Sequence, residues 1–261
     1  MLIQHIALLL LGFFLLWQGG HLMVTYASKI AKYYNVPDAI IGLTLVAFGT
    51  SAPELIVNII AILNNQSDLV FGNILGSNIS NTLLILGVTG ILYPLAVQKK
   101  IVQKDIPLSM ACLAFLSVLL VFPMTQLPAQ SLARWEGIPL LILFGLFLRK
   151  CFKEPREELD ETPNVGLGRA IALFLAGMTL LPIGAHLTVE SATILAANLG
   201  ISEALIGLAV VALGTSLPEL ATCVVASLKK QPDMAIGNII GSNIFNIILI
   251  LGITSLIRPI T

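Results

Sequence analysis

Charged residues are scarce in this sequence, and their scarcity excludes a soluble globular protein. Only 11% of the 261 residues are Asp, Glu, Lys or Arg, whereas soluble domains average about 25%. Hydrophobic residues make up 57% of the chain, and its mean hydropathy is +0.95. Too little polar surface remains to cover a soluble globule of this size. The composition therefore predicts an all-α polytopic membrane protein.

Cysteine is also rare, and its positions exclude two common kinds of site. Cys112, Cys151 and Cys223 lie in or beside apolar runs without C-x-x-C spacing, so neither a disulfide framework nor a zinc site is expected. Lys+Arg and Asp+Glu both total 14, and this balance indicates no nucleic-acid partner. The sequence contains no H-E-x-x-H motif and no nucleophile with an adjacent base. We therefore expect no enzyme activity and no cofactor.

Long apolar runs suit helices that cross a membrane. A hydrocarbon core about 30 Å thick requires roughly 20 apolar residues in a helix. Eight spans are predicted, and the fifth is the shortest. They cover about residues 3–28, 39–63, 69–95, 106–122, 135–150, 168–197, 203–228 and 234–258.

The basic residues predict how these spans are oriented, because loops on the cytoplasmic side are enriched in Lys and Arg. If the N-terminus lies outside, 12 of the 14 basic residues fall in inner loops, and only Arg134 and Arg258 lie outside. We therefore expect a multi-pass protein of the plasma (cell inner) membrane. The 12 are Lys29, Lys32, Lys99, Lys100, Lys104, Arg149, Lys150, Lys153, Arg156, Arg169, Lys229 and Lys230.

The second half of the chain repeats the first. A shift of 165 positions aligns residues 12–89 with 177–254 without a gap, and 38 of the 78 pairs are identical. The longest matches pair G-T-S-A-P-E-L at 49–55 with G-T-S-L-P-E-L at 214–220, and G-N-I-L-G-S-N-I-S-N at 72–81 with G-N-I-I-G-S-N-I-F-N at 237–246. Shared hydrophobicity does not explain identical Gly, Pro, Glu and Asn positions.

The repeated motifs fall on the second and third predicted spans and again on the seventh and eighth. Successive spans cross the bilayer in alternate directions, and equivalent spans are an odd number apart, so the two copies run in opposite directions. Such an inverted-topology repeat is typical of transporters with a site near the midplane. We predict a first repeat of five helices over 1–153, a cytoplasmic linker over 154–166, and a second repeat of three helices over 167–261.

Glu54 and Glu219 are isolated acids within two of these spans. An ionisable group at mid-membrane costs about 2.5–3.5 kcal/mol on insertion scales, so each needs either a proton or a bound cation. Proline precedes each acid, removes a backbone donor and disturbs the preceding helical turn. Backbone carbonyls around 47–50 and 212–215 would then lose their helical hydrogen bonds. At this depth in the membrane, such groups are tolerated only where they are buried in protein or line a cavity. A hydrogen-bonded structural acid is the simpler alternative.

Hydroxyl and amide oxygens accompany these acids. Ser77 and Asn81 are four residues apart and share one helical face, as do Ser242 and Asn246. Carboxylates, carbonyls, hydroxyls and amides form an all-oxygen set that suits Ca²⁺ and Na⁺. The repeated Gly-x-x-x-Gly spacing is typical of close helix packing.

These motifs resemble the two alpha-repeats of the sodium/calcium exchanger family, within the cation/Ca²⁺ antiporter superfamily. The resemblance covers nearly the whole chain. It implies ten helices in two inverted halves of five, with exchange of Ca²⁺ for Na⁺ by alternating access. The implied Ca²⁺ ligands are Glu54 and Glu219 with the backbone carbonyls of Thr50 and Thr215. The implied Na⁺ ligands are Ala47, Ser51, Ser77, Ala212, Ser216 and Ser242, with Asn81 and Asn246 completing the centre.

The family pattern includes two helices after the eighth span, so eight of the expected ten are predicted here. Truncation, or a second subunit that covers the gap by self-association, would account for the difference. Two alternatives therefore stay open beside Ca²⁺/Na⁺ exchange. One is a proton-coupled cation exchanger, although related Ca²⁺/H⁺ exchangers usually have Gly-Asn where this sequence has Gly-Thr-Ser. The other is a membrane subunit that binds ions without transporting them.

Overall fold

The computed structural model describes residues 2–95, 97–122, 131–153, 165–201 and 214–261, and its regular elements in these ranges are all helical. Six segments are long and apolar enough to cross a membrane, and they coincide with six of the predicted spans within a few residues. These segments are Leu2–Tyr34, Asp38–Leu63, Ser67–Leu92, Ile101–Val121, Leu167–Asn198 and Pro232–Ile257.

Two further helices match parts of the remaining predicted spans. Helix α7 (Gly137–Phe152) follows a 3₁₀ turn, η4 (Arg134–Glu136), and has 16 residues. Helix α10 (Leu217–Leu228) is the second part of the predicted seventh span, whose first part lies outside the described residues. Both are short for a full crossing, since about 20 residues are needed.

Several of the long segments contain π-helical turns. The second segment comprises α2 (Asp38–Ile41), η1 (Gly42–Val46) and α3 (Ala47–Leu63), and the fourth comprises η3 (Ile101–Asp105) and α6 (Ile106–Val121). The third is α4 (Ser67–Ile79), η2 (Ser80–Ile85) and α5 (Leu86–Leu92). Pro232–Ile257 is divided into α11 (Pro232–Ile244), η5 (Phe245–Ile250) and α12 (Leu251–Ile257). The bounds of these last two segments differ by 165 residues throughout, so the sequence repeat is also a repeat of local structure.

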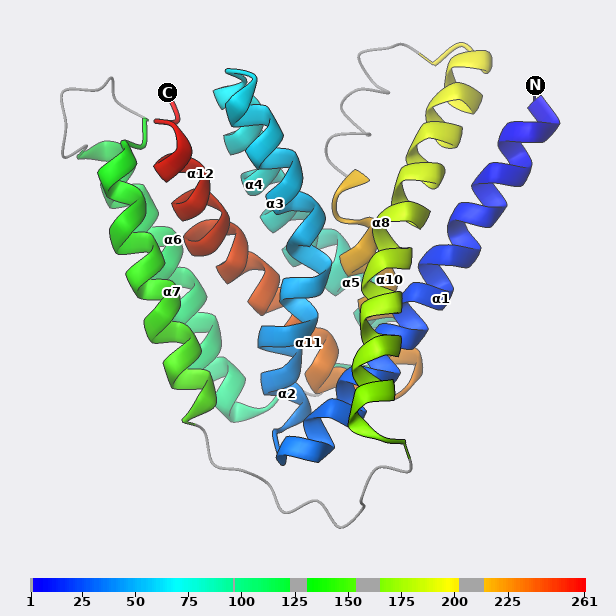
Figure 1. Cartoon of the computed structure of the whole chain (residues 1–261), viewed down its shortest axis with the longest axis horizontal. Helices are drawn as coiled ribbons and strands as arrows, with labels where there is room; N and C mark the ends of the chain where they lie inside the picture. Colours follow the sequence, from blue (N-terminus) through cyan, green and yellow to red (C-terminus); the bar gives the residue numbers. More distant parts are fainter. Residues whose placement is uncertain (1, 96, 123–130, 154–164, 202–213) are drawn as a thin grey trace.

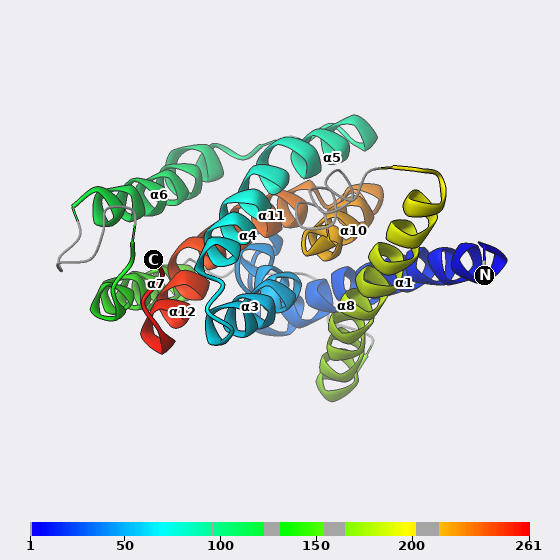
Figure 2. The same ribbon diagram turned by 90° about the horizontal axis from the view of Figure 1, so that it is seen from above.

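The helices form three groups (Figures 1 and 2). Helices α3, α4 and α11 lie centrally, α6 and α7 lie on one side, and α1 (Leu2–Tyr34) and α8 (Leu167–Asn198) lie on the other. Both chain termini lie at one end of the molecule, whereas α1 and α7 end and α8 begins at the opposite end. The ends of the helices therefore collect at two opposite ends of the molecule.

Small residues bring α1 and α8 into close contact in opposite directions. A Cβ added to Gly177 would lie 2.7 Å from the carbonyl oxygen of Gly19, and one added to Gly184 would lie 2.9 Å from that of Gly12. Glycine permits this approach of the two backbones. Because Gly12 pairs with Gly184 and Gly19 with Gly177, the two helices run antiparallel.

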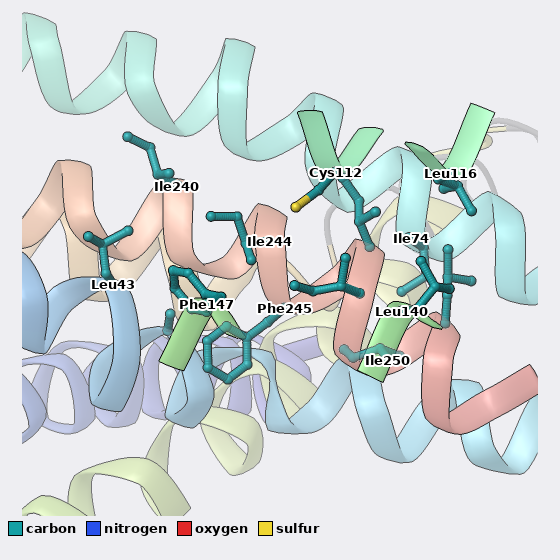
Figure 3. Packing of buried hydrophobic residues seen from close by; sticks show 14 of the residues in the cluster. Leu43, Ile74, Cys112, Leu116, Leu140, Phe147, Ile240, Ile244, Phe245 and Ile250 are labelled. Carbon is teal, nitrogen blue, oxygen red and sulfur yellow. The ribbon is translucent and has the colours of Figure 1, made fainter. Parts of the chain in front are cut away.

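An aromatic cluster joins α7 to the centre of the molecule. Phe245 contacts Phe144 edge-to-face, with ring centroids 5.0 Å apart, and Phe147 lies 6.3 Å from it. Figure 3 shows Phe147 and Phe245 among the buried side chains of Leu43, Ile240 and Ile244. This packing holds α7 against η5.

The predicted break before each acid is present in one copy only. Helix α3 continues through Pro53 from Ala47 to Leu63, so the expectation of a disturbed turn there is wrong. Residues Thr215 and Ser216 instead form a turn, and α10 begins at Leu217. Proline is tolerated in the first turn of a helix because its missing donor would have no partner there. Within a membrane helix, neighbouring helices compensate for the single lost hydrogen bond.

Candidate functional site

The two repeated glutamates lie fully buried in the centre of the protein. Glu54 is on α3 and Glu219 is in the first turn of α10, and both have 0% exposure. Helices α3 and α10 pack against each other, so the two acids lie on neighbouring helices. In the described part of the chain, neither carboxylate has an ion-pair partner. Among the described residues, both oxygens of Glu54 and Oε2 of Glu219 have no hydrogen-bond partner.

Hydroxyl groups from both copies surround Glu219. Ser51 Oγ of α3 donates to Glu219 Oε1 at 3.2 Å, and Ser242 Oγ of α11 donates to the same oxygen at 3.4 Å. The hydroxyl of Ser216 is buried without a hydrogen-bond partner. Carboxylates left with unfilled acceptor positions in a buried site normally require a cation or a proton.

Each copy inserts its threonine between an asparagine and a serine of the other. Thr50 Oγ1 donates to Asn238 Oδ1 at 3.1 Å and lies 3.2 Å from Ser242 Oγ. The corresponding contacts in the other direction use residues 165 positions away. Thr215 Oγ1 donates to Asn73 Oδ1 at 3.0 Å and lies 3.2 Å from Ser77 Oγ. The two threonine segments are thus held by matching contacts across the centre.

Four asparagines of η2, η5 and the preceding helices form a second set of paired contacts. Asn81 Nδ2 donates to Asn243 Oδ1 at 3.1 Å, and Asn246 Nδ2 donates to Asn78 Oδ1 at 2.9 Å. These bonds use the amide nitrogens of Asn81 and Asn246 and leave both Oδ1 atoms buried with no partner among the described residues. Two further buried oxygens are therefore available on η2 and η5.

The predicted site residues that lie in the described part of the chain are on the central helices or directly before them. Ala47 is buried, and its carbonyl oxygen lies 3.3 Å from Thr50 Oγ1. Ala212 lies outside the described residues. Sequence reasoning missed Asn73, Asn78, Asn238 and Asn243, although all four belong to the repeated G-N-I-x-G-S-N motif. The identity of these positions in both copies was the signal that could have found them.

A cavity reaches this centre from one side. It has a volume of about 360 Å³ and is lined by Asn73 and Thr215, by Pro53 and Pro218, and by His186 of α8. The cavity therefore connects the space beside α8 to the Thr215 contacts.

The chemistry of the site is that of oxygen ligands. Among the described residues, no group of three or more His, Cys, Asp or Glu side chains could hold a metal ion. Two carboxylates with hydroxyl, amide and carbonyl oxygens suit hard cations such as Ca²⁺, for which six to eight oxygens are usual. The buried oxygens without partners fit this ligand set.

Comparisons with known proteins match nearly the whole chain to a single family. Residues 4–152 and 169–261 match the family described as "Sodium/calcium exchanger protein". The chain is 39% identical over 267 residues to the inner membrane protein YrbG of Escherichia coli (strain K12), covering 97% of this chain and 80% of YrbG. It is 34% identical over 306 residues to the sodium/calcium exchanger MaX1 of Methanosarcina acetivorans, covering 100% of this chain and 85% of MaX1.

A solved structure shares the fold. The sodium-calcium exchanger NCX_Mj, soaked with 10 mM Na⁺ and zero Ca²⁺, matches with a TM-score of 0.85 and 33% sequence identity, covering 100% of this chain and 85% of NCX_Mj. The resemblance predicted from the repeated motifs is thereby confirmed. This chain is a multi-pass integral membrane protein and belongs to the sodium/calcium exchanger family.

Proposed function

We propose that this protein is a secondary antiporter that exchanges Ca²⁺ for Na⁺ across the membrane by alternating access. One observation carries the proposal: Glu54 and Glu219 are fully buried at the centre, and three of their four carboxylate oxygens have no hydrogen-bond partner in the described part of the chain. The names of MaX1 and NCX_Mj as sodium/calcium exchangers support it. Two carboxylates carry −2, which one Ca²⁺ or two Na⁺ would neutralise.

In the proposed site, Ca²⁺ binds between the two carboxylates and the backbone carbonyls of Thr50 and Thr215. Sodium uses the hydroxyl and carbonyl oxygens around them, and two central amides complete the site. The unpartnered Oδ1 atoms of the two amides and the unpartnered hydroxyl of Ser216 support this set. The proposed Na⁺ ligands are Ala47, Ser51, Ser77, Ala212, Ser216 and Ser242, with Asn81 and Asn246 at the centre.

Alternating access follows from an inverted repeat, which we propose to comprise residues 1–153 and 167–261, joined by a cytoplasmic linker over 154–166. Contacts in matched pairs 165 residues apart, such as Thr50 with Asn238 and Thr215 with Asn73, support this assignment. The antiparallel packing of α1 on α8 does so too. In this proposal the two helices slide together across the centre and open the site to one side at a time.

The proposed orientation places the N-terminus outside the plasma (cell inner) membrane. Lys29 and Lys32 of α1, and Arg149 and Lys150 of α7, lie near the helix ends opposite the two chain termini. Basic residues favour the cytoplasmic side, so this end would face the cytoplasm. The cavity beside His186 would then give access to the site from outside. Lipid and the two cations are the partners this role requires, and it requires no cofactor and no enzyme chemistry.

Ca²⁺ flux in proteoliposomes tests the proposal. With Na⁺ loaded inside and absent outside, the wild-type protein should accumulate ⁴⁵Ca²⁺, and Glu54→Gln should abolish this uptake because one of the two site charges is lost. Glu190→Gln is the matched control, since Glu190 is an exposed glutamate on α8 paired with His186. It should transport at the wild-type rate.

The same vesicles distinguish the alternatives. Uptake that follows a pH gradient and ignores Na⁺ would show that the two glutamates exchange Ca²⁺ for protons. Ca²⁺ binding without flux in any gradient would identify a subunit that binds ions without transporting them. Undiminished uptake by the Glu54→Gln protein would refute the assignment of the site.

A further inference from the structure

Among the differences between the two copies of the repeat, one lies a helical turn after the site glutamate. Asn58 lies four residues after Glu54, and Cys223 occupies the corresponding position after Glu219. Both side chains are fully buried. Cys223 is not among the residues expected to contact an ion, so the difference calls for its own explanation.

Cys223 is hydrogen-bonded in both directions. Its Sγ accepts a hydrogen bond from Asn238 Nδ2 at 3.3 Å and donates to the carbonyl oxygen of Ala235 at 3.6 Å. The other end of the same amide, Asn238 Oδ1, accepts from Thr50 Oγ1 at 3.1 Å. The thiol is therefore linked to Thr50 through a single amide group.

The amide anchors Thr50, whose backbone carbonyl is a proposed Ca²⁺ ligand. With Oδ1 toward Thr50, the threonine hydroxyl donates to Asn238 and ties this turn of α3 to α11. The single proton of the thiol is used on the carbonyl oxygen of Ala235, so Sγ can only accept from Asn238. A reversed amide would place Oδ1 against the thiol without a donor, so the thiol favours the orientation that accepts from Thr50.

The first copy lacks this arrangement. Asn73 Oδ1 accepts from Thr215, but Asn73 Nδ2 is buried without a hydrogen-bond partner. Asn58 donates through Nδ2 to the carbonyl oxygen of Glu54 on its own helix, at 2.7 Å. Among the described residues, therefore, only the second copy binds the Nδ2 group of this asparagine.

We propose that Cys223 is a positioning residue for ion binding: its thiol orients the Asn238 amide that holds Thr50, and so keeps the Thr50 backbone carbonyl in place for the cation between Glu54 and Glu219. The inference rests on the proposed function for the identity of the ion. It assigns to the thiol an effect on affinity, and none on the rate at which the helices move.

The test compares Cys223→Ala with Cys112→Ala. Cys112 is a second buried cysteine, on α6, so the control creates a similar void without touching the site. Loss of the thiol should raise the Ca²⁺ concentration at half-maximal uptake about three- to tenfold, as expected for one lost hydrogen bond. The maximal rate should not change. Cys223→Ser keeps a donor and an acceptor and should stay within twofold of wild type.

A double-mutant cycle separates positioning from packing. In an Asn238→Ala background, Cys223→Ala should have almost no further effect, because the group that the thiol orients is gone. Equal effects of Cys223→Ala in both backgrounds would overturn the proposal. So would a Cys223→Ser protein as impaired as Cys223→Ala, or a Cys112→Ala protein with the same loss.

Calorimetric Ca²⁺ binding to the purified protein keeps the two proposals apart. If wild type binds Ca²⁺ and the Cys223 variants follow the pattern above, but no gradient drives flux, the proposed exchange fails and the positioning role stands. If exchange is normal and the variants bind Ca²⁺ like wild type, the positioning role fails alone.

Discussion

At the scale of single residues, the site is defined by oxygens that lack partners. Asn81 and Asn246 use their amide nitrogens on Asn243 and Asn78, and these bonds hold each Oδ1 in a buried position without a donor. A buried acceptor without a partner costs about 1–3 kcal/mol. A bound cation would offset this cost, which is why such atoms mark an ion site.

Replacing Asn246 tests this reasoning. Asn246→Ala removes one unpartnered oxygen and leaves Asn78 Oδ1 without its donor, so we expect Ca²⁺ affinity to fall roughly tenfold. Equilibrium binding of ⁴⁵Ca²⁺ to the purified protein measures it. Asn198→Ala, at an exposed amide on α8 bonded to the carbonyl of Ile194, is the control. Wild-type affinity in the Asn246 variant would contradict a role in ion binding.

At the scale of helices, equivalent glycines of the two copies have different surroundings. A Cβ on Gly241 of α11 would lie 2.5 Å from the carbonyl oxygen of Leu43 and 2.7 Å from the Cβ of Ala47. A Cβ on Gly76, the equivalent residue of α4, would meet nothing within 4 Å. Close packing of α11 on η1 and α3 therefore depends on Gly241, whereas the packing of α4 does not require glycine at position 76.

This difference predicts unequal effects of the same substitution. Gly241→Ala should lower stability by about 1–3 kcal/mol, because backbone atoms must move to admit the methyl group. Gly76→Ala should be neutral or slightly stabilising, since alanine is the better helix former. Thermal unfolding in detergent compares the two. Equal melting temperatures for the two variants would show that α11 and η1 do not pack as described.

At the scale of the whole molecule, the two ends differ in charge, and this difference sets the proposed orientation. Leu199, directly after α8, and Lys153, directly after α7, are both exposed and lie at opposite ends. All three native cysteines are buried. Single cysteines at these two positions therefore report on the two sides of the membrane.

Labelling with a membrane-impermeant maleimide tests the orientation. In intact cells, Leu199→Cys should be labelled and the wild-type protein should not, because the native thiols are covered. Lys153→Cys should react only after the membrane is permeabilised. The reverse pattern would place the N-terminus inside.

Much of the site could be predicted because its residues occur in both copies of the sequence repeat. Polar residues in apolar spans are costly, so their recurrence at a shift of 165 positions pointed to Glu54 with Glu219 and to Thr50 with Thr215. The roles of Asn73 and Asn238 were missed because an asparagine in a glycine-rich helix is typical of helix packing, and its hydrogen-bond partner is not visible in the sequence. The continuous course of α3 through Pro53 was also missed, since the supporting neighbours come from other parts of the chain.

The sequence alone determined the membrane class, the repeat and the residue types of the site, because these follow from the cost of polar groups in lipid and from periodic spacing. Only the tertiary structure decided which copy breaks at its threonine, which glycines are in close contact, and that Cys223 holds the amide facing Thr50. Those properties depend on distances between segments far apart in the chain, and equivalent residues in two copies need not have equivalent neighbours.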